Sequence, residues 1–191
     1  MKSLAALLVL VAATANAQTL PDRLSRATRD SMMTVIERAA ADSLPTASLY
    51  AKAAEGVLKR ADDARILIAV RNLARALADA RSSLPAGAAD ATVVAAASAL
   101  QAGAQRSVIS RYASVSQGGQ SDLAIAYVTL ADLIASNVPA PAASRSVEML
   151  LRSGFRETDL TSFRAAVMRD IQAGAKPEDA LRTNAPRSLR P

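Results

Sequence analysis

The segment 136–174, which reads SNVPAPAASRSVEMLLRSGFRETDLTSFRAAVMRDIQAG, decides how the whole chain is interpreted. Three residues that end helices divide it: Asn137, Gly154 and Gly174. Asn and Gly tolerate the left-handed backbone conformation that closes a helix. Pro139 and Pro177 follow two of these stops, and proline suits the start of the next helix because its φ is fixed and it lacks an N–H. The segment therefore predicts helices joined by short turns.

Helix-ending residues recur along the rest of the chain, which reads as looser copies of this unit. The stops that we identify are Leu44, Ala61, Leu84, Gly103, Gly118, Asn137, Gly154 and Gly174. Pairing successive helices between them gives a unit of about 37 residues, within the range of helix-pair repeats. An offset of 94 residues also aligns Pro45 with Pro139 and Ile66 with Leu160. In periodicity the chain resembles helix-pair repeat proteins of the tetratricopeptide or HEAT kind, but the residues diagnostic of tetratricopeptide units are not in register, so no family is assigned.

The composition favours helices over strands. Hydrophobic residues make up 51% of the chain but aromatic residues only 3%, and alanine, the strongest helix former, supplies much of the apolar mass. The β-branched and aromatic residues that favour strands are sparse. We therefore predict an all-α fold, an α-solenoid-like or helical-repeat-like array of about eight antiparallel helices, because each helix carries one apolar stripe and the turns recur.

The first 17 residues have the order of a secretory signal peptide. Lys2 gives a positive start, residues 4–13 are an uninterrupted apolar run, and Ala15-Asn16-Ala17 supplies the small residues that signal peptidase requires. The run is shorter than the roughly 20 residues that a membrane span needs. We therefore expect a signal peptide over residues 1–17, cleavage after Ala17, a periplasmic or secreted location, and no transmembrane span in the mature chain.

The mature chain is expected to form a single helical domain over residues 18–182 and a flexible basic tail over residues 183–191, which holds two prolines. The first helix should run from Pro21 to Ala40. An uncharged, alanine-rich stretch over residues 91–104 is too short to cross a bilayer, and it predicts a central, fully buried helix. Because the sequence contains no cysteine, no disulfide can form and stability must come from burial.

The longest helix is expected to begin at Asp62 and Asp63 and to end near Ser82, since acidic residues suit a helix start. Its apolar residues are spaced 4, 3 and 4 apart and predict an inward seam: Ile66, Val70, Leu73 and Leu77. Arg75 and Asp79 are placed to pair across one turn of the exposed face.

Residue types needed for common catalytic chemistry are missing. The chain has no His and no Cys, which removes the imidazole base, the thiolate nucleophile and the soft ligands of zinc sites. Its acidic clusters (Asp62-Asp63, Glu157 with Asp159, and Glu178-Asp179) all fall at expected helix starts, where carboxylates cap backbone N–H groups. We therefore assign no catalytic residue, no cofactor-binding residue and no metal ligand, and expect no enzyme activity.

Arginine carries most of the positive charge, with a formal net charge of +6. Two arginine clusters are candidate contacts for an anionic surface: Arg23, Arg26 and Arg29, which would share a stripe on the first helix, and Arg182, Arg187 and Arg190 in the tail. Few scattered aromatics and an export signal argue against nucleic acid. The favoured hypothesis is an exported, non-catalytic scaffold that binds a protein or peptide partner in the cell envelope. The alternative is an arginine-mediated binder of anionic lipid or polysaccharide.

Overall fold

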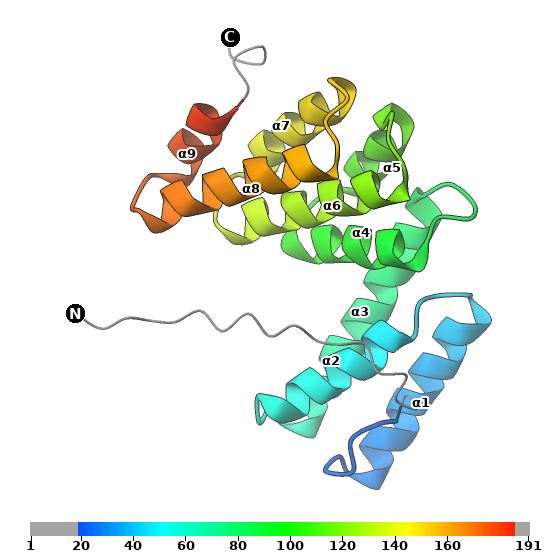
Figure 1. Cartoon of the computed structure of the whole chain (residues 1–191). Helices are drawn as coiled ribbons and strands as arrows, with labels where there is room; N and C mark the ends of the chain where they lie inside the picture. The colour runs from blue at the N-terminus through cyan, green and yellow to red at the C-terminus, as the bar shows by residue number, and fades with distance from the viewer. Residues whose placement is uncertain (1–18, 186–191) are drawn as a thin grey trace.

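The computed structural model describes residues 19–185, and in this range the protein consists of nine α-helices without a β-strand (Figure 1). The helices are α1 (Arg26–Ala41), α2 (Ala47–Leu58), α3 (Asp63–Ser83), α4 (Asp90–Ala102), α5 (Arg106–Val115), α6 (Gln120–Ala135), α7 (Ala140–Arg152), α8 (Glu157–Gln172) and α9 (Pro177–Asn184). The all-α prediction is confirmed, with one helix more than expected in this range. The predicted signal peptide, residues 1–17, lies outside the described residues.

Six of these helices end in the same backbone motif. The residues with positive φ that close them are Ser43, Arg60, Gly103, Asn137, Gly154 and Gly174. At the end of α7, the N–H of Gly154 bonds to the carbonyl of Leu151, and the N–H of Phe155 bonds to the carbonyl of Leu150, both at 3.1 Å. This pair of bonds defines the Schellman motif. The stops predicted from Asn and Gly in the segment 136–174 are therefore confirmed, whereas the left-handed Ser43 and Arg60 were not predicted.

Two predicted boundaries are wrong. The first helix begins at Arg26 rather than Pro21, because the hydroxyl of Ser25 caps it by accepting a hydrogen bond from the N–H of Thr28 at 3.4 Å. At the other end, α9 continues to Asn184, so residues 183 and 184 are helical rather than part of a flexible tail. The side chain of Asn184 holds this last turn by donating to the carboxylate of Asp170 in α8 at 2.6 Å.

The helices pack mainly against near neighbours in the chain. α4, α6 and α8 lie side by side as one layer, with α5 and α7 in contact with each other on its flank (Figure 1). The long helix α3 contacts α1 and α2 along one part of its length and α4 and α5 along another, while α9 packs on α8. As a result α3 connects the α1–α2 end of the molecule to the remaining helices.

The alanine-rich helix α4 lies between α3 and α6 and contacts both. Six of its 13 residues are buried, but Asp90, Ala91, Ser98 and Gln101 are exposed, so the prediction of a fully buried helix holds for only part of its circumference. Its small buried side chains allow the neighbouring helices to approach closely.

One arginine connects the end of α3 to the segments around it. The guanidinium of Arg81 donates to the carbonyl of Ala88 at 2.7 Å and to the carbonyl of Ser43 at 3.2 Å, and it pairs with the carboxylate of Asp90 at 3.0 Å. Its side chain is only 27% exposed. These contacts join the α1–α2 turn, the α3–α4 connection and the start of α4.

The 94-residue offset seen in the sequence also relates helix positions. Adding 94 to the bounds of α1 gives the bounds of α6, and the first residue of α3 maps to the first residue of α8. The left-handed residues correspond as well, Ser43 to Asn137 and Arg60 to Gly154. The pair α1–α3 and the pair α6–α8 are both in contact, whereas the middle helices differ: α2 packs on α3, and α7 packs on α5 and α6.

A backbone-to-carboxylate bond joins the helix starts within each pair. The N–H of Ser25, the N-cap of α1, bonds to the carboxylate of Asp63 in α3 at 2.9 Å. The N–H of Glu157 in α8 bonds to the carboxylate of Asp122 in α6 at 2.7 Å. Both bonds hold two helix N-termini together, so the helices of each pair run parallel (Figure 1).

The carboxylate of Asp122 is well satisfied although its side chain is only 13% exposed. Burial alone would raise its pKa, but the N–H groups of Glu157 and Gly119 and the Arg156 guanidinium outweigh that effect and lower the pKa below its ordinary value. The charged form of Asp122 therefore stabilises the folded protein.

We expect Asp122→Asn to lower the free energy of unfolding by about 1–2 kcal/mol at pH 7, the usual effect of losing a helix-capping carboxylate. Because the folded-state pKa is lowered, this contribution is present above the unfolded value of about 3.9 and is lost as the pH falls through the folded pKa. Urea unfolding at pH 7 and at pH 3 measures the difference. Asp30→Asn is the control, since its exposed carboxylate makes no hydrogen bond or ion pair with the described residues. If Asp122→Asn lowered the free energy of unfolding equally at both pH values, the charge of Asp122 would not be what stabilises the fold.

The predicted seam of α3 is confirmed: Ile66, Val70, Leu73 and Leu77 are all buried. We expect Leu73→Ala to lower the free energy of unfolding by roughly 2–5 kcal/mol, because it leaves a cavity beside the core. The matched control is Ile68→Ala on the same helix, where the side chain is 56% exposed. Thermal or urea unfolding of both variants measures the effect, and equal stabilities would show that the wrong face of α3 has been placed inside.

Candidate functional site: an arginine-lined cleft between α1 and α3

The first predicted arginine cluster does not form a common stripe on α1. Arg23 precedes the helix and donates to the carbonyl of Val57 at the end of α2 at 3.2 Å. Arg26 is the first helical residue, and Arg29 pairs with Asp22 at 3.5 Å. The expected stripe is wrong because the chain bends at Ser25 before the helix begins.

The helix α9, which carries Arg182 of the second predicted cluster, lies at the opposite end of the molecule from α1 (Figure 1). Arg182 is in α9 rather than in a flexible tail, and its guanidinium pairs with Asp179 one turn earlier at 2.7 Å. Arg187 and Arg190 lie outside the described residues. The structure therefore does not bring Arg182 together with the arginines near α1.

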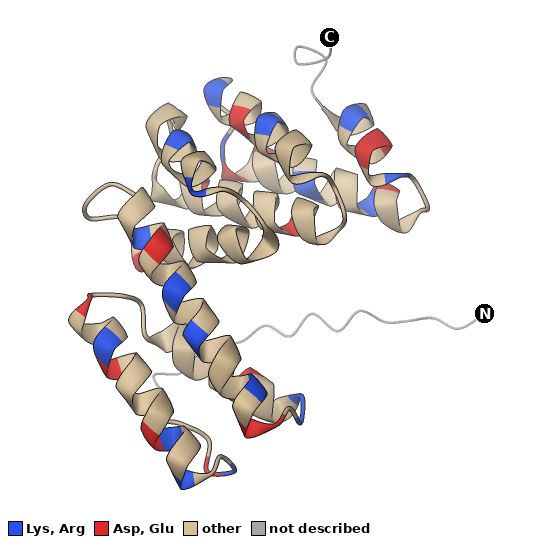
Figure 2. Cartoon of the chain, turned by 180° about the vertical axis from the view of Figure 1, so that it is seen from behind, with Lys and Arg blue, Asp and Glu red and all other residues tan. Residues whose placement is uncertain are grey.

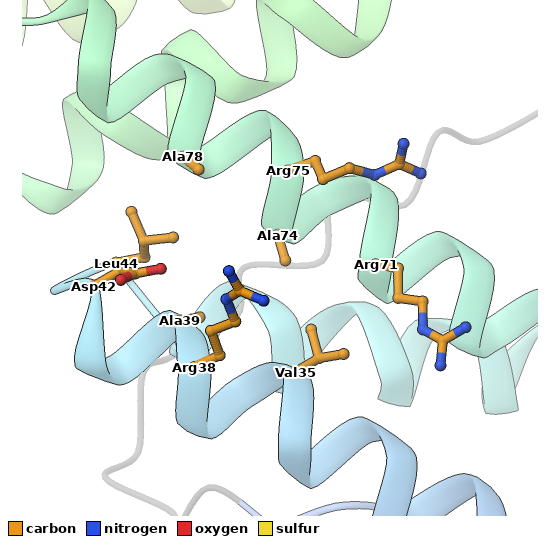
Figure 3. A pocket seen from close by; sticks show the side chains of 9 residues that line it. All are labelled: Val35, Arg38, Ala39, Asp42, Leu44, Arg71, Ala74, Arg75 and Ala78. Carbon is orange, nitrogen blue, oxygen red and sulfur yellow. The ribbon is translucent and has the colours of Figure 1, made fainter.

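A cleft of about 510 Å³ between α1 and α3 combines apolar and basic side chains (Figure 3). The residues from α1 that line it are Val35, Arg38 and Ala39, followed by Asp42 directly after the helix and Leu44 beyond the turn. The residues from α3 are Arg71, Ala74, Arg75 and Ala78. Each helix contributes positions i, i+3, i+4 and i+7, which form one stripe over two helical turns. The cleft is therefore the groove between two parallel helices.

The charges around this cleft are unbalanced. Three arginines face one acidic residue, Asp42, and α3 carries a succession of basic positions along its length (Figure 2). Within residues 19–185, the side chains of Arg38 and Arg71 make no hydrogen bond or ion pair, while Arg75 bonds to the neutral side chain of Asn72. The predicted Arg75–Asp79 pair is wrong, because Asp79 pairs with Arg106 of α5 instead.

The floor of the cleft is apolar. Ala39 and Leu44 are 3% and 8% exposed, and Val35 and Ala74 are half-buried. The side chains of Ala74 and Ala78 are too short to fill the space between the helices. Figure 3 shows the guanidinium group of Arg38 in that space and the Arg75 side chain extending away from α1. Such a site suits a ligand that carries both apolar and acidic groups.

The pair α6–α8, called the second helix pair below, shows the same positions with side chains that bond to other residues of the protein. At an offset of 94, Arg38 corresponds to Asp132, which pairs with Arg164 at 3.0 Å. Ala74 corresponds to Met168, whose sulfur accepts a hydrogen bond from the hydroxyl of Ser136 at 3.2 Å. The position of Arg71 is taken by Ala165. The unpaired arginines at positions 38 and 71 and the small side chain at position 74 are thus particular to the α1–α3 pair.

A second recess lies beside α5 and α7, and several of the charged side chains that line it pair with one another. A groove of about 350 Å³ lies between the two helices, a second one of about 450 Å³ is lined by residues of α7, and Arg145 and Glu148 line both. The carboxylate of Glu148 is 17% exposed and pairs with Arg111 at 3.3 Å and with Arg152 at 2.9 Å. Among the described residues Arg145 has no hydrogen-bond or ion-pair partner, so this recess has one unpaired arginine where the α1–α3 cleft has two.

Two buried tyrosines beside this recess are structural. The rings of Tyr112 and Tyr127 stack with centroids 5.7 Å apart. The hydroxyl of Tyr112 donates to the carbonyl of Ser144 at 2.8 Å, and that of Tyr127 donates to the carbonyl of Ile109 at 2.7 Å. Burial raises the pKa of both phenols above the ordinary value. Both hydroxyls are therefore neutral and already bonded to the backbone.

The described part of the chain contains no cluster of three or more acidic side chains that could hold a metal ion. Across residues 19–185, none of the helices combines the length and the hydropathy required to span a membrane. No family model, curated protein or solved structure matches this chain. The function must therefore be argued from the geometry of the α1–α3 cleft.

The contacts of the arginines predict two different effects of mutation. Arg38→Ala and Arg71→Ala should change the free energy of unfolding by no more than about 0.5 kcal/mol, because neither side chain has a partner to lose. Arg81→Ala should lower it by about 2 kcal/mol or more, since three backbone and carboxylate partners lose a charged donor. Urea unfolding of the three variants measures this. If Arg38→Ala or Arg71→Ala lowered the free energy of unfolding as much as Arg81→Ala does, the cleft arginines would have a structural role.

Proposed function

We propose that this protein is an exported, non-catalytic helical module that binds a protein or peptide partner in the cell envelope through the α1–α3 cleft. The observation that carries the proposal is the pair of unpartnered arginines, Arg38 and Arg71, over an apolar floor. Charged side chains in a fold gain stability by pairing, as Asp132 and Arg164 do in the second helix pair. Arginines left unpaired around a recess are available to an acidic ligand.

The arrangement of the helices supports a scaffold role. Helices pack on near neighbours in the chain, α4 on α6 and α6 on α8, with α5 on α7 beside them. We take this as an α-solenoid-like array, an architecture that presents extended surfaces to peptides and partner proteins. The sequence of residues 1–17 supplies the argument for export, with Gln18 as the first residue of the mature chain.

The alternative is arginine-mediated binding to anionic lipid or polysaccharide. Two of the arginines that the sequence predicts for that role already have an acidic partner: Arg29 pairs with Asp22, and Arg182 pairs with Asp179. The unpaired arginines of the cleft instead border a recess, which a flat charged surface does not enter. The geometry therefore favours a protein segment over a membrane or polysaccharide surface.

Site-specific cross-linking in cells tests the proposal. A photo-reactive amino acid replaces Ala78, which lines the cleft, or Gln172, its counterpart at an offset of 94 in α8. We expect a discrete protein adduct from position 78 in the envelope fraction, on a mature chain that begins at Gln18. The adduct should be lost when Arg38 and Arg71 are both changed to Glu, because the charge of the rim is then reversed.

Two results would overturn this proposal. One is identical adducts from both positions, which would show that the cleft is not the contact. The other is the absence of an adduct together with sedimentation of the purified protein on anionic vesicles at low salt, which would favour the surface-binding alternative.

A further inference from the structure

We infer that the occupant of the α1–α3 cleft is an amphipathic helix of the partner that carries acidic residues on both flanks of a narrow apolar ridge. The inference rests on the proposed function and specifies the chemistry of the partner. It follows from the shape of the cleft, from the distribution of the arginines over its two walls, and from the difference between this helix pair and the second one.

The shape of the cleft fits a helix. Two parallel helices form its walls, and each wall is one i, i+3, i+4, i+7 stripe, so the groove is about 10 Å long, or two turns. A ridge of side chains on a third helix fits such a groove between helices. The ridge must be narrow, because it meets the buried Ala39 and Leu44 at the floor.

The arginines specify where the acids of the occupant lie. Arg38 stands on the α1 wall, and Arg71 and Arg75 stand on the α3 wall (Figure 3). An occupant therefore needs carboxylates on both sides of its apolar ridge to meet guanidinium groups from both walls. Asp42 lies at the end of the cleft near the C-terminus of α1, where it would repel an acid and so favours one orientation of the bound helix.

The second helix pair indicates which residues make the cleft selective. There Met168 takes the position of Ala74, and the position of Arg38 is acidic and already paired. We expect a helix with an apolar ridge to find less room at such a pair, because the longer Met168 side chain takes the place of a methyl group. Ala74 therefore provides the space for the ridge, while Arg38 and Arg71 provide the charge.

A synthetic probe tests this chemistry directly. The probe is a fluorescent, stapled helical peptide of four turns, with Leu at i, i+3 and i+7 and Glu on both flanks. Two comparison peptides replace every Glu by Gln or every Leu by Ala. Fluorescence anisotropy with the full chain should show saturable binding of the first peptide and binding at least tenfold weaker for each of the other two. Binding of the first peptide should also weaken as salt rises from about 0.05 to 0.5 M.

Protein variants then locate the site. Ala74→Met, which copies Met168, should reduce the affinity at least tenfold with an unchanged melting temperature, because it fills the recess. Arg38→Ala and Arg71→Ala should each weaken binding by about tenfold, the effect of losing a charge-assisted hydrogen bond. Arg169→Ala is the matched control, since Arg169 corresponds to Arg75 in the second pair, and it should leave the affinity unchanged.

The outcomes separate this inference from the proposed function. Equal affinities for the wild type and Ala74→Met, or equal binding of the Glu and Gln peptides, would overturn the inference about the occupant. If cross-linking from position 78 captures a partner but the acidic peptide does not bind, the proposed function stands and the assigned chemistry of its partner is wrong. If neither experiment succeeds, both are wrong.

Discussion

The left-handed residue that closes a helix is the constraint on which the rest of this structure depends. Each such residue ends the hydrogen-bond ladder within one turn and directs the chain backwards, so the next helix begins a few residues later. The residue after the stop is apolar in each of the six cases: Leu44, Ala61, Ala104, Val138, Phe155 and Ala175. Because two successive reversals restore the original direction, helices two apart in the chain, such as α1 and α3, become parallel neighbours. Their N-termini then meet, which is why the Asp63 carboxylate reaches the backbone of Ser25.

The sequence predicts those parts of the fold that depend on local chemistry. Asn137, Gly154 and Gly174 were recognised as stops because they tolerate positive φ, and the seam from Ile66 to Leu77 was recognised by its spacing. The sequence does not predict the left-handed conformation of Ser43 and Arg60, because a residue with a Cβ adopts positive φ only where the surrounding structure holds it there. The offset of 94 was visible in the sequence, but the agreement of helix bounds required the structure.

The candidate site was not predictable in the same way. The spacing of arginines in the sequence predicts clusters around Arg29 and Arg182, yet each of these two residues has an acidic partner in the structure. The two cleft arginines that have no partner, Arg38 and Arg71, come from different helices and lie more than thirty positions apart in the chain. Which arginine lacks a partner depends on packing between distant segments. The diversion of Asp79 to Arg106 illustrates the same dependence, because α5 lies close enough to compete with Arg75.

The correspondence between α1–α3 and α6–α8 has a consequence for how this chain came to vary. The bounds of α1 match those of α6 and the start of α3 matches that of α8, with largely different side chains, which is the pattern that tandem duplication followed by divergence would produce. In such a molecule one copy can drift in sequence while the other continues to supply a folded core, because mutations are tolerated as long as total stability stays above the threshold for folding. In this chain the pair α6–α8 carries the Arg164–Asp132 ion pair, and the pair α1–α3 carries the open cleft.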